Sequence, residues 1–71
     1  MKLPRDVSGT EAVRALKRLG FVVVRQVGSH IRLNKGSVNI TVPNHDPILP
    51  KTLQTLLRQA GVSLEEFMDS L

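Results

Sequence analysis

The chain has 71 residues, of which 41% are hydrophobic and 23% charged, and it contains no cysteine. These values predict one small folded domain over residues 1–71 and exclude a two-domain enzyme, a deep cofactor cleft and a repeat array. The absence of cysteine excludes a disulfide framework and a thiol nucleophile, and it fits a reducing compartment such as the cytoplasm. The longest apolar run, Phe21–Val24, is too short to span a bilayer, and the N-terminal residues show no apolar export signal.

The charges are distributed unevenly along the chain. Ten Lys and Arg residues against six Asp and Glu residues give a formal net charge of +4. Six of the basic residues fall within residues 12–35, which contain no acidic residue. This asymmetry favours RNA or DNA as a partner, although such a net charge is also ordinary for a small domain. Both aromatic residues, Phe21 and Phe67, are expected in the core, so no platform for stacking bases is predicted.

The first predicted element is a helix over residues 8–19. It opens with a capping-box pattern, Ser8-Gly9-Thr10-Glu11, and Gly20 suits a left-handed end. Its apolar residues recur at helical spacing: Ala12, Ala15, Leu16 and Leu19. Its basic residues lie on the opposite face and either contact phosphate or are simply solvated: Arg14, Lys17 and Arg18.

Three β-rich segments follow over residues 21–26, 30–34 and 38–42, separated by short turns. Such an order predicts an antiparallel meander. Alternation in the second and third segments directs one set of side chains to the core: Ile31, Leu33, Val38, Ile40 and Val42. The other set shares the opposite face: His30, Arg32, Asn34, Asn39 and Thr41.

A proline-containing loop over residues 43–50 leads to a second predicted helix, from Lys51 to a glycine end at Gly61. A second capping box, Ser63-Leu64-Glu65-Glu66, opens a short C-terminal helix. Its predicted apolar face consists of Leu64, Phe67, Met68 and Leu71. The order α-β-β-β-α predicts an α+β, double-stranded-RNA-binding-like domain, in which a three-stranded antiparallel sheet carries helices on one face.

His30 is the strongest candidate for chemistry. It follows Gly28-Ser29 on the predicted open face, two residues before Arg32. An exposed imidazole can take a proton from a ribose 2′-hydroxyl, and an arginine beside it can hold the phosphate. The residues alone also fit a surface histidine beside a turn glycine.

Two further positions have both a functional and a structural interpretation. His45 is either a second acid or base or part of an Asn/Asp-stabilised turn. Lys51 opens a helix, where free backbone N–H groups can bind phosphate. The two histidines lack the spacing of helical zinc motifs and no cysteine accompanies them, so no metal or other cofactor is expected.

Five stretches of the chain, taken in order, resemble the HicA toxins, which are small mRNA interferases of prokaryotic type II toxin–antitoxin modules. The stretches are Ser8-Gly9, Leu19-Gly20-Phe21, Gly28-Ser29-His30, Val42-Pro43-Asn44-His45, and Lys51-Thr52-Leu53 through Gln59-Ala60-Gly61. The resemblance implies the same double-stranded-RNA-binding-like fold. It also implies that His30 is the catalytic histidine, with Gly28 and Ser29 as its motif neighbours.

The resemblance further implies a metal-independent endoribonuclease that cleaves mRNA. The expected partner is a HicB-type antitoxin that covers the active face in a hetero-oligomer. His45 matches a loop histidine that is frequent in the family, and no role is assigned to it. The side chains expected to support catalysis or contact RNA are Arg14, Lys17, Arg18, Arg32 and Lys51. A non-catalytic RNA-binding module on the same fold is the alternative.

Overall fold

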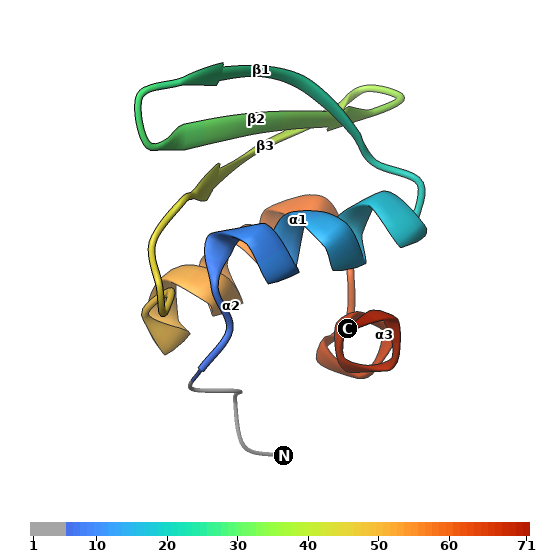
Figure 1. Ribbon diagram of the computed structural model, residues 1–71. Helices are drawn as coiled ribbons and strands as arrows, with labels where there is room; N and C mark the ends of the chain where they lie inside the picture. Colours follow the sequence, from blue (N-terminus) through green and yellow to red (C-terminus); the bar gives the residue numbers. More distant parts are fainter. Residues whose placement is uncertain (1–5) are drawn as a thin grey trace.

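The computed structural model describes residues 6–71 as six elements in a row (Figure 1). They are α1 (Gly9–Arg18), β1 (Val22–Val27), β2 (His30–Lys35), β3 (Val38–Pro43), α2 (Pro50–Ala60) and α3 (Leu64–Ser70). This is the predicted α+β, double-stranded-RNA-binding-like layout, so the fold class is confirmed. The segment in which we predict no export signal, residues 1–5, lies outside the described residues. Within residues 6–71, no helix combines the length and the apolar character that crossing a membrane requires.

Both predicted capping boxes form. At α1 the Glu11 backbone N–H donates to Ser8 Oγ at 3.1 Å, and the Ser8 N–H donates back to the Glu11 carboxylate at 3.2 Å. Ser63 and Glu66 repeat this exchange at α3. Each box satisfies two backbone N–H groups that a helix start would otherwise leave unpaired. The positive φ of 102° at Gly20 confirms that the chain turns left-handed just after α1.

The three strands form one antiparallel sheet in the order β1-β2-β3. In β2 the alternation is as predicted, since Ile31 and Leu33 are buried while His30 and Arg32 are exposed. Across the β2–β3 pair, Ile31 lies opposite Val42 and Leu33 lies opposite Ile40. The sheet therefore has one apolar face and one polar face, as the sequence predicts.

The prediction for β1 needs a correction. The strand covers residues 22–27 rather than 21–26, and Phe21 is buried just before it. The pairing also shifts between Val23 and Arg25, because a bulge at Val24 leaves Val23 opposite Leu33 but Arg25 opposite Arg32. An extra residue in one strand reverses the side to which every later side chain points. The bulge thus places Arg25 on the same face as Arg32.

The helices cover the apolar face of the sheet (Figure 1). Helix α1 packs against β1 and β3, and α2 packs against β3. The core between these layers includes the predicted stripe of α2, which is buried throughout: Leu53, Leu56, Leu57 and Ala60. The opposite face of the sheet is left without a covering helix among the described residues.

Helix α3 contacts α1 and α2 but none of the described strands. Only Phe67 of its predicted apolar face is fully buried, and Leu64 is half-buried. Met68 and Leu71 are 41% and 43% exposed, so the predicted apolar face is only partly covered by the rest of the protein. A seven-residue helix that docks at the edge of two others buries one narrow stripe, since no layer lies on its far side.

Candidate functional site

Three segments that are far apart in the sequence meet at one corner of the molecule. The Asn44 N–H, after β3, donates to the carbonyl of Ser29 in the β1–β2 turn at 2.6 Å. The Gly9 N–H, at the start of α1, donates to the carbonyl of His45 at 2.8 Å. These two bonds hold the helix start, the turn and the loop together. His30 begins β2 immediately after the turn, so this corner fixes the backbone that carries its side chain.

The close approach at this corner requires glycine at position 9. A Cβ atom on Gly9 would lie 2.6 Å from the Pro43 carbonyl oxygen and 2.7 Å from Asn44 Cα. Both neighbours are backbone atoms, which cannot rotate away as the end of a side chain can. Gly9 therefore lets α1 start directly against the loop after β3.

Gly28 has a different reason to be glycine. Its φ is 59°, in the left-handed region that the tight turn between β1 and β2 needs, and a Cβ there would meet no atom within 4 Å. The Gln26 side-chain amide donates to the Gly28 carbonyl at 3.1 Å and braces the turn. Gly28 thus shapes the turn before His30 and leaves the space above it open.

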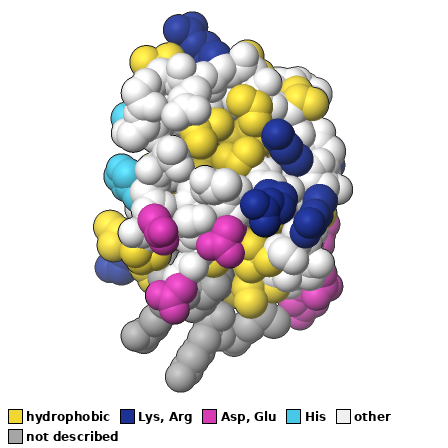
Figure 2. Space-filling model, in the orientation of Figure 1, with side chains coloured by type: hydrophobic (Ala, Val, Ile, Leu, Met, Phe, Trp, Pro, Cys, Tyr) yellow, Lys and Arg dark blue, Asp and Glu magenta, His cyan; other side chains and the backbone are white. Residues whose placement is uncertain are grey.

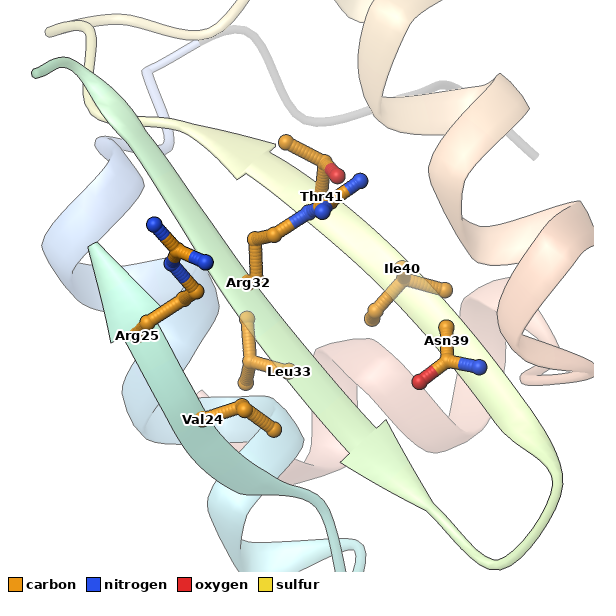
Figure 3. A pocket seen from close by; sticks show the side chains of 7 residues that line it. All are labelled: Val24, Arg25, Arg32, Leu33, Asn39, Ile40 and Thr41. Atoms are coloured by element: carbon orange, nitrogen blue, oxygen red, sulfur yellow. The ribbon is translucent and has the colours of Figure 1, made fainter. Parts of the chain in front are cut away.

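His30 lies on the open face, where its backbone pairs with Val27 on one side and Pro43 on the other. It borders a shallow depression of about 440 Å³ whose lining residues come from all three strands: Arg25, Val27, His30, Arg32 and Thr41. A second depression of about 330 Å³ continues from it and shares Arg25, Arg32 and Thr41 (Figure 3). In Figure 3 the Arg32 side chain extends toward Thr41, while Arg25 lies beside it on the neighbouring strand.

Positive charge dominates the open face. Arg25 and Arg32 are direct cross-strand partners, and β1, β2 and β3 contain no acidic residue. Like charges placed directly opposite each other in a sheet are destabilising, so this pair does not serve the stability of the sheet. Two guanidinium groups on an open face suit an anion such as phosphate, which each can bind through paired N–H donors. Arg32, a candidate predicted from the sequence, is therefore accompanied by Arg25, which the sequence did not single out.

The cations of α1 lie in a separate place. Arg14 and Lys17 line a depression of about 290 Å³ between α1 and the sheet, together with Thr10, Val13, Gln26, Ile31 and Asn44. On this side of the molecule Figure 2 shows Lys and Arg side chains beside a hydrophobic patch. The Arg18 guanidinium donates to the Ser70 carbonyl at 2.7 Å, so Arg18 ties α1 to the last turn of α3. The structure thus does not bring these helix cations into the depression beside His30.

The two remaining candidates also lie outside that depression. His45 is exposed in the loop after β3 and contributes its carbonyl to the corner described above. Lys51 is exposed in the first turn of α2, whose N-cap Leu49 makes no side-chain capping bond. Within residues 6–71, no three His, Cys, Asp or Glu side chains are grouped as a metal site would require.

Comparison with known proteins identifies a family for the chain. A search of the curated proteins found no match. A family model described as the HicA toxin of bacterial toxin–antitoxin matches residues 9–62. The match runs from Gly9, across the β1–β2 turn and the open face, to the end of α2, so it contains every segment of the corner and every residue of the His30 depression. The chain therefore belongs to the HicA family of toxins from bacterial toxin–antitoxin modules.

Proposed function

We propose that this chain is an endoribonuclease that cleaves mRNA, with His30 as its catalytic base. The observation that carries the proposal is the position of His30, exposed at the edge of a depression that also holds the opposed pair Arg25 and Arg32. A proton acceptor beside two phosphate-binding groups is the minimum that cleavage of RNA by its own 2′-hydroxyl requires. Membership of a toxin family supports the same activity.

In the proposed reaction the neutral imidazole of His30 accepts the proton of a ribose 2′-hydroxyl. The 2′-oxygen forms a bond to the adjacent phosphorus, and the bond from phosphorus to the 5′-oxygen of the next nucleotide breaks. That oxygen takes a proton from water or from His45. The products are a 2′,3′-cyclic phosphate and a 5′-hydroxyl end. Arg25 and Arg32 bind the phosphate and stabilise the negative charge that grows on it.

The substrate we propose is single-stranded mRNA in the cytoplasm. A shallow, open depression gives an extended strand access to His30, and sequence-specific recognition of RNA mostly targets single-stranded segments, whose bases are unstacked. Within the toxin–antitoxin module, a HicB-type antitoxin binds the toxin and covers this face. Arg14, Lys17 and Lys51 bind phosphates farther along the strand.

The proposal is tested by replacing each histidine with alanine in the full chain. His30→Ala should lower the rate of mRNA cleavage by about 10²–10⁴-fold and abolish growth arrest, because it removes the general base. Its melting temperature and RNA affinity should stay close to those of the parent, since the side chain is exposed. His45→Ala identifies the source of the leaving-group proton, because it slows cleavage if His45 supplies that proton and leaves the rate unchanged if water does. Unchanged cleavage by folded His30→Ala protein contradicts the proposal, and RNA binding without cleavage by the parent favours a non-catalytic RNA-binding module.

A second measurement tests whether a metal takes part. The nucleophile in the proposed reaction is the substrate's own hydroxyl, and the leaving oxygen needs only a proton, so no metal ion is required. Cleavage of a single-stranded mRNA should therefore continue in EDTA. Loss of activity that Mg²⁺ or Mn²⁺ restores would contradict this mechanism and direct attention to Asp6, Asp46 and the two histidines as ligands.

A further inference from the structure

The outer strand β1 is unusually open for the edge of a sheet. Among residues 6–71 its only neighbour in the sheet is β2, and all six of its residues are exposed. Val22, Val24 and Val27 are 58%, 59% and 53% exposed. Val22 and Val27 lie opposite Asn34 and His30 on the open face, and Val24 lines the depression beside Arg25. We call these four residues, Val22, Val24, Arg25 and Val27, the β1 margin.

The other edge strand of the sheet, β3, has features that commonly keep an edge strand from pairing with another chain. Asn39 is the one exposed residue of strand β3, α2 packs against this strand, and the strand ends at a proline. Sheets avoid unwanted pairing by such covering elements, by proline or by charged side chains along the edge. The β1 margin has only its bulge and Arg25, which leaves backbone N–H and C=O groups beside a row of valines. An edge of this composition is a site for another strand to pair.

In the proposed function RNA accounts for Arg25, but it does not account for the three valines of the β1 margin. Single-stranded nucleic acids bind through cations for phosphate and through aromatic rings for bases, and valine offers neither. A second copy of the chain does not fit either, because pairing β1 with β1 would bring Arg25 and Arg32 of each copy toward the same cations of the other. Because successive side chains of a strand point to opposite faces, valines and cations on one face complement an extended strand whose every second residue is in turn apolar or acidic.

We propose that an acidic, apolar segment of the partner antitoxin adds to the sheet as a fourth strand beside β1. Its backbone pairs with the free edge, its apolar side chains cover Val22, Val24 and Val27, and its carboxylates bind Arg25 and Arg32. Strand addition at this edge occludes His30, since Val27 is the cross-strand neighbour of His30. This inference rests on the proposed function for the identity of the partner, whereas the surface chemistry stands on the β1 margin alone.

The test uses the full chain and an eight-residue peptide, Val-Thr-Glu-Thr-Val-Thr-Glu-Thr, in which valine and glutamate take turns along one face of the strand. Added peptide should slow hydrogen exchange at the β1 amides that do not bond to β2, and it should inhibit RNA cleavage. A peptide with lysine in place of glutamate should do neither. Val22→Asp should weaken binding of the Val/Glu peptide at least about tenfold, because it removes an apolar contact and adds repulsion. The control Gln54→Asp adds the same charge on the exposed side of α2 and should leave binding unchanged.

Three results would overturn the inference. The first is equal binding of the glutamate and lysine peptides. The second is binding of the glutamate peptide without protection of the β1 amides, which would indicate simple charge attraction in the depression. The third is a dimer of the chain, in sedimentation, whose β1 amides are protected without peptide. The RNA cleavage assay without peptide separates the two proposals. If the peptide protects the β1 amides but the protein does not cleave RNA, only the proposed function is contradicted. If the protein cleaves RNA but the peptide does not protect the β1 amides, only this inference is contradicted.

Discussion

The two faces of the sheet are built from alternate residues of the same strands, but they serve opposite purposes. On the covered face, Leu33 and Ile40 oppose each other and are 1% and 3% exposed beneath the helices. On the open face, one position away, Arg32 opposes Arg25 in an arrangement that a stability requirement alone would avoid. Neighbouring residues of β2 therefore have different roles: those on the covered face stabilise the fold, and those on the open face are proposed to bind and cleave RNA. Substitutions on the two faces should therefore have separable effects.

The largest effect on stability is expected on the covered face. Leu33→Ala removes a side chain that is almost completely buried and leaves a cavity, which lowers the free energy of unfolding by about 2–5 kcal/mol. In so small a domain this is a large part of the total stability. Urea denaturation measures the loss. The neighbouring Arg32→Ala is the control. It should lose RNA affinity without loss of stability, because it relieves the repulsion with Arg25. Equal destabilisation by both variants would remove the distinction between the faces.

The next largest effect on stability is expected at the corner where the start of α1 meets the β1–β2 turn and the loop after β3. Gly9→Ala would place its Cβ against the backbone of Pro43 and Asn44, and such overpacking costs about 1–3 kcal/mol. The direction of the change in stability is informative, because alanine stabilises a helix relative to glycine wherever its Cβ is not crowded. Thr10→Ala, at the exposed neighbouring position, is the control for helix propensity. A Gly9→Ala protein that melts at or above the parent temperature would contradict the close approach.

The sequence predicts the covered face better than the open one, for a physical reason. Burial requires apolar residues at a fixed period, so Ile31, Leu33, Ile40 and Val42 reveal both the strands and their orientation. The run Val22-Val23-Val24 has no alternation, and a bulge within it leaves no mark in the pattern. For this reason the sequence places His30, Arg32 and Thr41 on one face, but it does not place Arg25 or Val27 beside them, because the proximity of these two depends on register.

The corner shows a second limit of the same kind. The sequence marks Gly9, Gly28 and Asn44 as part of a family resemblance, but it does not show that their segments touch. The contacts join α1, the β1–β2 turn and the loop after β3, and they depend on how the helix docks on the sheet. Met68 and Leu71 show a related limit. Helical spacing indicates which residues share one side of a helix, but not whether another element covers that side.

The smallest effect on stability, and the sharpest test of the open face, is expected from Arg25→Gln. Removing one of two opposed cations should raise the free energy of unfolding by roughly 0.2–1 kcal/mol, because cross-strand repulsion is relieved. RNA affinity should fall at the same time, and the slope of log affinity against log salt should decrease by about one, as one phosphate contact is lost. Urea denaturation and a salt titration of RNA binding measure the two changes. Arg58→Gln, an exposed cation on α2, is the control and should alter neither. A gain in stability coupled to a loss in RNA binding identifies Arg25 as a residue that serves ligand binding rather than stability. An Arg25→Gln protein that binds RNA with the parent salt slope would instead exclude Arg25 from the phosphate site and leave Arg32 alone beside His30.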